Sequence, residues 1–318
     1  MSNEHQSNDM SRNDAGMTEP EKLMLCIMGR ISDTDAPIVF KGALITKLIL
    51  SEHGYGEVIR TTNDIDANWV GASPSMSHLV DVVNQSLTDM QGSFTALAIR
   101  EYAEGRSAGI SIVDNTTGKE IFSVDISIKP VGASTVYYYG DIGIKGVLPD
   151  EVLADKIVVL SSRLLFRRMK DLVDVYAMSH CVDVRPKRIF EVCASKGRVV
   201  EDFDAFINRR PDVEQSYSKL KGIDGKPDFD AIYSYMSKFV EPFVQKKHSD
   251  MRWDSDTMTW LDDGFKRERE EPPKPKPKTS KPSILAQIHE FNAKNNAQNQ
   301  ERTSINRGKR KSNNEPDQ

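Results

Sequence analysis

The spacing of apolar and polar residues predicts a strand, a turn and a helix in the first part of the chain. Residues 38–40 form a short apolar run typical of a buried strand, and residues 44–50 carry helix-forming side chains with one apolar side. Between them, residues 41–43 form a turn that contains Gly42. A glycine there lets backbone N–H groups approach a phosphate, although one glycine by itself more often marks only a tight turn.

Further elements follow from the same spacing. Thr18 is suited to cap a helix that carries apolar residues to position 28. A helix is also predicted at residues 77–87, and strands at residues 96–102 and 109–113. The strand at residues 120–128 has period two: one face is apolar, and the other carries Ser123, Asp125 and Ser127. Asp125 therefore either lies on a solvated face or points into a site, and the small serines beside it fit both interpretations.

From Pro149 the pattern is helical for about thirty residues, as one amphipathic helix or as a helix pair. In one continuous helix, six charged residues would share about a third of the circumference; they are Lys156, Arg163, Arg167, Lys170, Asp171 and Asp174. Apolar residues would lie opposite. The pattern by itself favours a solvated face over a functional one.

Shorter helices are predicted at residues 187–192, 200–207 and 229–242, with a loop at residues 222–228. Composition then divides the chain into four segments. These are a disordered N-terminus (1–18), a folded core (19–147), a helical C-terminal domain (148–265), and a Pro/Lys-rich linker with a basic tail (266–318). The basic end of the tail could contact nucleic acid, but a solvated tail is the simpler interpretation.

Composition narrows the function classes only slightly. The 318 residues suffice for two ordinary domains or one domain with tails, and the net charge of −4 indicates no particular partner. The sequence contains no run of about 18 apolar residues, so no membrane span is expected. The polar start does not resemble a secretory signal. Three scattered cysteines indicate reduced thiols and a cytoplasmic protein. No Cys-x-x-Cys or His-Glu-x-x-His pattern supports zinc or thiol chemistry.

The motif with the clearest chemistry is Asp64-Ile65-Asp66. In a strand both carboxylates face the same way, and they repel each other unless one is protonated or a cation lies between them. Mg²⁺ and Mn²⁺ prefer such oxygen ligands, although a solvated turn is the plainer alternative. With Asp125 on a later strand, three carboxylates could hold two divalent ions. That arrangement is typical of phosphoryl or nucleotidyl transfer.

At this point the chain resembles the AbiEii/AbiGii abortive-infection toxin family, within the nucleotidyltransferase superfamily that has a DNA polymerase β-type core. The resemblance covers about residues 36–180 and rests on four motifs in order: Phe40-Lys41-Gly42-Ala43, Arg60-Thr61-Thr62-Asn63-Asp64-Ile65-Asp66, Asp125, and Lys156 to Lys170-Asp171-Leu172-Val173-Asp174. The sequence departs from the pattern at Ala43, where a second glycine is usual, and at Ile45 or Thr46, where a small hydroxyl residue is usual. These departures put the phosphate contact or the nucleotide choice in doubt.

The resemblance implies an α+β fold: a nucleotidyltransferase core of mixed β-sheet with flanking helices, then an α-helical C-terminal domain. The disordered Pro/Lys-rich tail that follows is expected from composition and is not part of the resemblance. It implies an enzyme that uses Mg²⁺ or Mn²⁺ to move a nucleotide from an NTP to an acceptor. The acceptor would be an RNA such as tRNA, or else a protein. The protein would be the toxin of a toxin–antitoxin or abortive-infection phage-defence system. Its partner would be an antitoxin encoded nearby, and no membrane association is expected.

The same resemblance assigns roles to individual residues. Asp64, Asp66 and Asp125 would be metal ligands, and Asp125 would also help to deprotonate the acceptor hydroxyl. The expected nucleotide- or phosphate-binding residues are Lys41, Gly42, Arg60, Thr62, Lys156, Lys170, Asp171 and Asp174. The alternative is a catalytically degenerate fold that binds a nucleotide or nucleic acid as an interaction module. Ala43 motivates this alternative, and the retention of all three aspartates argues against it.

Overall fold

The computed structural model describes residues 16–88, 90, 93–102, 107–128 and 131–262. Contacts divide the chain into Met1–Phe265 and Lys266–Gln318, so all described residues belong to the first unit. Disorder was predicted for residues 1–18, of which 1–15 lie outside the described residues; residues 16–18 are described, and Thr18 caps a helix. The predicted tail over 266–318 also lies outside the described residues.

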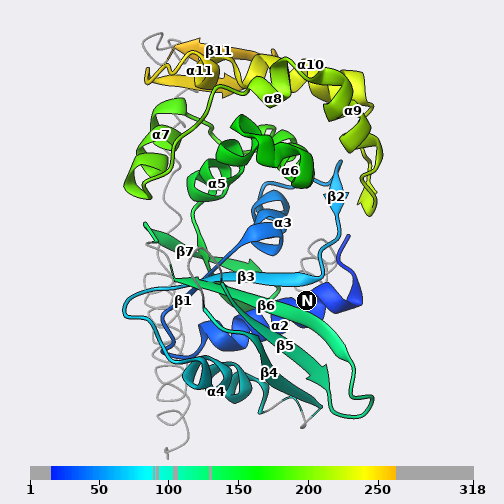
Figure 1. The fold of residues 1–318 in the computed structure, drawn as a ribbon, viewed down its shortest axis with the longest axis vertical. Coiled ribbons are helices and arrows are strands. Elements are labelled where there is room, and N and C mark those ends of the chain that lie inside the picture. Colours follow the sequence, from blue (N-terminus) through cyan, green and yellow to red (C-terminus); the bar gives the residue numbers. More distant parts are fainter. Residues whose placement is uncertain (1–15, 89, 91–92, 103–106, 129–130, 263–318) are drawn as a thin grey trace, which may run out of the picture. The chain divides into compact units, whose positions relative to one another are not determined.

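A seven-stranded mixed sheet forms the centre of the first unit (Figure 1). Its strand order is β4-β5-β6-β3-β1-β8-β7. The β3–β6 and β1–β8 pairs are parallel, and the other pairs are antiparallel. The strands are β1 (Ile38–Lys41), β3 (Asp64–Trp69), β4 (Phe94–Arg100), β5 (Ala108–Asp114), β6 (Glu120–Ile128), β7 (Ser134–Tyr139) and β8 (Ile142–Val147). The predicted mixed sheet is confirmed.

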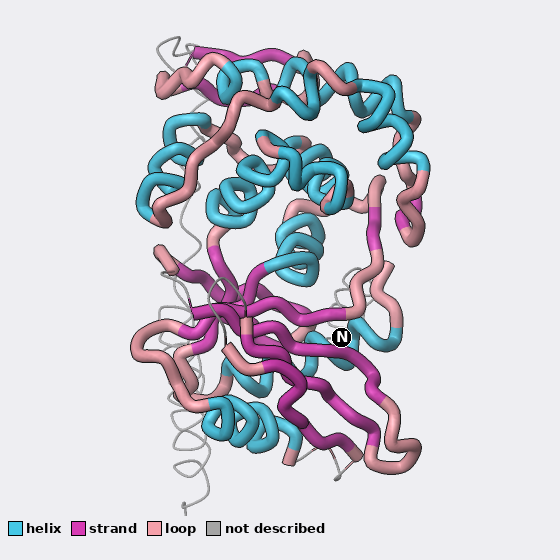
Figure 2. Tube along the Cα trace, in the orientation of Figure 1, coloured by secondary structure: helices cyan, strands magenta, loops and turns pink. Residues whose placement is uncertain are grey.

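Helices cover both faces of the sheet. Helices α2 (Glu19–Ser32) and α4 (Met76–Leu87) pack together on one face (Figures 1 and 2). Helix α3 (Gly42–Glu52) lies on the other face, against α5 (Pro149–Ser161) and α6 (Lys170–Ser179). Apolar side chains of the strands and of these helices pack into one buried hydrophobic core. A capping box between Thr18 and Glu21 starts α2, in agreement with the predicted cap.

The C-terminal part is mainly helical. It contains α5 (Pro149–Ser161), the 3₁₀ helix η1 (Arg163–Arg167), α6 (Lys170–Ser179), α7 (Pro186–Ser195), α8 (Asp204–Ile207), α9 (Arg210–Ser218), α10 (Phe229–Phe239) and α11 (Glu241–Val244). A hairpin of β10 (Met251–Asp254) and β11 (Thr259–Asp262) comes after α11. Two further short strands, β2 (Ile59–Arg60) and β9 (Ile223–Asp224), pair with each other. This pairing joins the predicted loop at 222–228 to the segment before Asp64.

Of the two alternatives for the helical stretch from Pro149, the structure has the helix pair, α5 and α6, and not one continuous helix. Ser162 has an extended backbone, with φ −118° and ψ 173°, and its hydroxyl accepts a hydrogen bond from the N–H of Leu164, so α5 ends there. The charged residues consequently do not form one stripe. Arg163 and Arg167 are exposed on η1, whereas Lys156 and Asp174 are buried between α5 and α6. The helix expected at 200–207 is also shorter, because Phe203 has φ 60° and α8 begins after it.

Candidate functional site

Three charged residues face one another across the middle of the sheet. In the antiparallel β1–β3 pair Lys41 is opposite Asp66, and in the parallel β3–β6 pair Asp66 is opposite Asp125. Residues that are directly paired in a sheet project to the same face, so these side chains share one surface. The Nζ atom of Lys41 donates to Oδ1 of Asn68, 2.8 Å away, on the same face of β3.

The two carboxylates of the Asp-x-Asp motif are differently placed. Asp64 is exposed, and its Oδ1 accepts a hydrogen bond of 2.6 Å from the hydroxyl of Thr62. Asp66 is more enclosed: burial raises its pKa, the negative charges of Asp64 and Asp125 raise it further, and Lys41 only partly offsets them. A cation between Asp64 and Asp66 would relieve this repulsion, so the pair fits a divalent ion in charge and in oxygen chemistry.

Position 42 requires a glycine because the backbone there passes close to the Asp66 carboxylate. Its φ of +75° lies in the left-handed region, and a Cβ atom there would stand 2.2 Å from Oδ2 of Asp66. Helix α3 starts at Gly42, so the positive end of its dipole lies next to the Asp66 carboxylate. The hydroxyl of Thr46 donates to the Gly42 carbonyl at 2.9 Å and is therefore engaged within the helix.

A buried ion network lies beside the Asp-x-Asp strand. The Nε and Nη2 atoms of Arg60 donate to the two oxygens of Asp174 at 2.7 and 2.9 Å. The Nζ of Lys156 lies 2.5 Å from Oδ2 of Asp174 and 3.1 Å from Oδ1 of Asp171. Burial would raise the pKa of Asp174, but the charges of Lys156 and Arg60 overcome it and hold that pKa well below its usual value. Burial likewise opposes the charge on Lys156, and the two aspartates raise its pKa.

A cavity of about 800 Å³ opens over the Asp-x-Asp motif. Arg60, Thr62, Asp64 and Asp66 line it from the sheet side. The opposite wall comes from η1, the start of α6 and the end of α9, and includes Phe166, Arg167, Arg168, Lys170, Asp171, Ser216, Lys219 and Leu220. Its size suits a nucleotide-sized ligand.

The predicted site residues therefore divide into three groups. Arg60, Thr62, Asp64, Asp66, Lys170 and Asp171 line the cavity. Lys41, Gly42 and Asp125 adjoin Asp66, while Lys156 and Asp174 are buried in the ion network. The Nζ of Lys156 is held by two aspartates in this structure, so its contact with a triphosphate stays a prediction.

Several residues at the cavity were not identified from the sequence as site residues. Arg167 belonged only to the predicted charged stripe, and Lys219 lies after α9, a helix for which no pattern indicated a site. Within the described part of the chain Arg167, Lys170 and Lys219 form no ion pair, so three uncompensated cations lie along one wall of the cavity. The Arg167-Arg168 doublet was the available signal for one part of this wall.

Asp125 also has a partner that the sequence did not indicate. Arg100, at the end of the edge strand β4, forms an ion pair with Oδ1 of Asp125. Within the described residues, no three His, Cys, Asp or Glu side chains are grouped to hold a metal ion. The three-carboxylate metal site thus stays a prediction, with Asp64 and Asp66 as the pair whose surroundings fit an ion.

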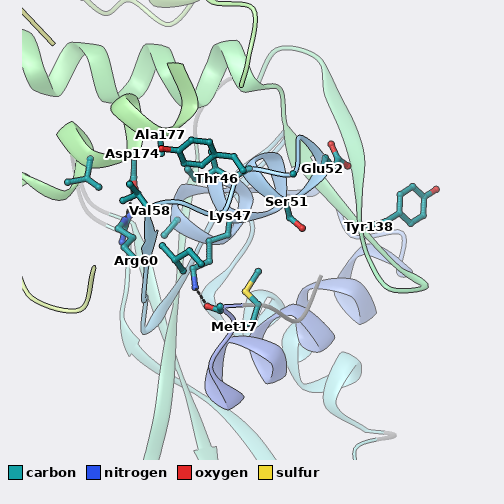
Figure 3. Close-up of a pocket in the computed structure, with 18 residues that line it drawn as sticks. Met17, Thr46, Lys47, Ser51, Glu52, Val58, Arg60, Tyr138, Asp174 and Ala177 are labelled. Carbon is teal, nitrogen blue, oxygen red and sulfur yellow. Dashed lines mark hydrogen bonds and ion pairs between the residues drawn. The ribbon is translucent and has the colours of Figure 1, made fainter. Parts of the chain in front are cut away.

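A second cavity, of about 860 Å³, adjoins the first, and Figure 3 shows residues that line it. Arg60 and Ala43 line both cavities, so the Arg60–Asp174 pair forms part of the wall between them. In Figure 3 Lys47 extends toward the segment that begins with Met17, and its Nζ donates to the carbonyl of Gly16 at 3.1 Å.

The sequence matches the family described as "Nucleotidyl transferase AbiEii toxin, Type IV TA system" over residues 27–257. The chain belongs to the AbiEii nucleotidyltransferase toxin family. The match includes the mixed sheet, the cavity and most of the C-terminal helices, so membership extends beyond the motifs that suggested it. A search among curated proteins returns no match.

Solved structures similar to this AbiEii-family chain include JHP933 from Helicobacter pylori, at 15% identity and a TM-score of 0.46, covering 73% of this chain and 96% of that one. Another is MenT4, a nucleotidyltransferase toxin from Mycobacterium tuberculosis, at 18% identity and a TM-score of 0.43, covering 81% and 94%. A nucleotidyltransferase-like protein from Paracoccidioides brasiliensis has 13% identity and a TM-score of 0.34, with 62% and 91% covered. In the part of the chain that the structure describes, every helix is too short or too polar to span a bilayer.

Proposed function

We propose that this protein is a divalent-metal-dependent enzyme that transfers a nucleotide from an NTP to an RNA acceptor such as tRNA. It acts in the cytoplasm as the toxin of a toxin–antitoxin or abortive-infection phage-defence system, and a cognate antitoxin encoded nearby controls it. One observation carries the chemical part: Asp66 lies opposite Asp125, with Gly42 and the start of α3 packed against the Asp66 carboxylate. This combination joins acidic ligands to a helix N-terminus suited to phosphate.

The residues of the cavity have distinct proposed roles. Asp64 and Asp66 would hold Mg²⁺ or Mn²⁺, which when bound supplies positive charge to the triphosphate and its leaving group. The backbone N–H groups at the start of α3, with Lys41 nearby, would bind the phosphates. Asp125 would accept the proton of the attacking hydroxyl. The Thr62 hydroxyl holds Asp64 in orientation through its 2.6 Å hydrogen bond.

The cations at the cavity support a polyanionic acceptor. Arg167, Lys170 and Lys219 lie around the cavity without a carboxylate partner among the described residues. Such side chains attract phosphates, and each contact with a nucleic-acid backbone adds affinity that declines with salt. The ring of Phe166 lies at the same wall. The guanidinium of Arg209 covers one face of this ring, 4.7 Å from its centroid, and the other face offers a stacking surface for a base.

The test is transfer of label from each of the four α-³²P-labelled NTPs, with Mg²⁺, to the macromolecules of a cell lysate. Digestion of the product with ribonuclease or with protease then identifies the acceptor. We expect the label to be lost with ribonuclease and retained with protease. Retention after ribonuclease would contradict an RNA acceptor, and no transfer at all would contradict the enzyme.

The interaction-module alternative predicts a different result. Ala43 lines the cavity where the family pattern has a second glycine, which is the observation that favours it. Under this alternative, binding to nucleic acid would survive Asp64→Ala and disappear when residues 267–318 are deleted. The biological assignment has its own check: a small antitoxin gene beside this one, whose co-expression restores growth.

A further inference from the structure

The row of charged residues across the sheet extends beyond Asp125 to the sheet edge. Asp125 is opposite Gly109 in the β5–β6 pair, and Gly109 is opposite Arg100 in the β4–β5 pair. One cross-sheet row over five strands therefore consists of Lys41, Asp66, Asp125, Gly109 and Arg100. Its two carboxylates are Asp66 and Asp125, and its two ends are the cations Lys41 and Arg100.

Gly109 lets the arginine reach its partner across an intervening strand. A Cβ atom at Gly109 would stand 3.3 Å from Cβ and 3.4 Å from Cζ of Arg100, so the arginine side chain passes directly over this glycine. Two further hydrogen bonds hold the guanidinium there. Its Nε donates to the carbonyl of Ser107 at 2.9 Å, and its Nη2 donates to the Ser107 hydroxyl at 3.1 Å.

Arg100 contacts the carboxylate that a metal ion at this row would share with Asp66. Its Nη2 atom donates to Oδ1 of Asp125, the carboxylate directly opposite Asp66. A guanidinium on Asp125 neutralises part of the negative charge that this carboxylate offers to a metal ion, so Arg100 and an ion shared by Asp66 and Asp125 compete for the same carboxylate. The side chains of Arg100 and Asp125 are 42% and 33% exposed, and ion pairs this exposed are weak and easily broken.

We infer that Arg100 competes with the divalent ion for Asp125 and thereby sets the metal requirement of the site. It holds the third carboxylate while no ion is bound, and it releases Asp125 when an ion enters beside Asp66. Arg100 is thus a positioning residue that acts through Asp125. The inference rests on the proposed function only in taking Asp64 and Asp66 to bind an ion.

The test measures Mn²⁺ binding to the full-length protein without NTP, from the electron paramagnetic resonance signal of free Mn²⁺. Arg100→Gln removes the competitor, and we expect it to tighten Mn²⁺ binding by about two- to five-fold, as loss of an exposed ion pair allows. The gain should shrink as salt is raised, because salt already weakens the pair. Arg252→Gln is the matched control, since Arg252 is an exposed arginine on β10.

A double-mutant cycle separates competition at Asp125 from a general charge effect. If Arg100 acts through Asp125, Arg100→Gln leaves Mn²⁺ affinity unchanged in an Asp125→Asn background. An equal gain in that background, an equal gain in Arg252→Gln, or no gain in Arg100→Gln would each overturn the inference.

Asp66→Asn separates this inference from the proposed function. If Asp66→Asn abolishes Mn²⁺ binding while Arg100→Gln has no effect, the metal site stands and the inference about Arg100 fails. If Mn²⁺ does not bind even to the wild-type protein, both fail. Melting temperatures equal to wild type verify that each variant is folded.

Discussion

Asp174→Asn should destabilise the protein far more than loss of an ordinary surface carboxylate. The side chain of Asp174 is 4% exposed and receives Arg60 through two hydrogen bonds and Lys156 through one. Asparagine keeps the shape but removes the negative charge, leaving two buried cations with only partial compensation from Asp171. Breaking a buried pair by removing one partner costs about 3–5 kcal/mol. In a chain of this size each kcal/mol lowers the melting temperature by about 2–4 °C.

The effect depends on pH with a definite sign. Because the pKa of Asp174 is lowered on folding, its contribution to stability is fully present above its ordinary pKa of 3.8. The contribution is lost as the pH falls toward the lowered, folded-state pKa. The difference in unfolding free energy between wild type and Asp174→Asn should therefore be constant near neutral pH and shrink only below about pH 4.

Urea denaturation followed by circular dichroism measures this difference. Asp212→Asn is the control, because Asp212 pairs with Arg209 at an exposed position where such pairs contribute about 1 kcal/mol or less. A wild-type-like unfolding free energy for Asp174→Asn, or a loss no larger than that of Asp212→Asn, would refute the assignment of a buried network. Destabilisation that is unchanged in acid would refute its electrostatic cause.

Three other variants test separate parts of the site. Gly42→Ala adds a Cβ atom 2.2 Å from the Asp66 carboxylate at a φ of +75°, so nucleotide transfer should fall about 100-fold as measured by label incorporation; transfer near the wild-type rate would contradict the close approach. Glu21→Gln removes the charge of a fully buried carboxylate that accepts a hydrogen bond from the N–H of Thr62 and pairs with Lys47. The free energy of unfolding in urea titrations should therefore fall by about 3 kcal/mol, and an unchanged midpoint would contradict a stabilising role for this ion pair. Lys219→Gln should weaken RNA binding and reduce the slope of log affinity against log salt by about one in filter binding, and an unchanged slope would argue against a phosphate contact.

The local parts of the site could be predicted because short-range rules determine them. The period-two pattern of residues 120–128 indicated the strand that carries Asp125, and the Asp-x-Asp spacing put Asp64 and Asp66 on one side of another strand. Gly42 was expected from a strand-to-helix turn. Each of these depends on residues within a few positions of one another.

The register of the sheet could not be predicted in the same way. That Asp66 lies directly opposite Asp125 depends on the pairing of β3 with β6, which are separated by more than fifty positions. The ion pair of Arg100 with Asp125 depends in addition on β5 lying between them with a glycine at the crossing point. Neither arrangement leaves a periodic signal in the sequence.

The charged helix shows why periodicity alone misled. The charged residues from Lys156 to Asp174 share one stripe only if the helix between them is unbroken. Ser162 ends α5, and a 3₁₀ helix lies between α5 and α6. Lys156 and Asp174 consequently meet between two packed helices rather than on a solvated face. Lys219 joins the cavity through tertiary packing, so no local pattern identified it.

The proposed chemistry depends most directly on the Asp-x-Asp carboxylates. The decisive measurement is the initial rate of label transfer from α-³²P-labelled NTP to RNA by wild type, Asp66→Asn and Asp81→Asn, each at saturating Mg²⁺. Asp81 is an exposed aspartate on α4, on the opposite face of the sheet from α3, and serves as the matched control. We expect Asp81→Asn to transfer label at the wild-type rate and Asp66→Asn to transfer none above background. Equal transfer by wild type and Asp66→Asn would contradict the central claim.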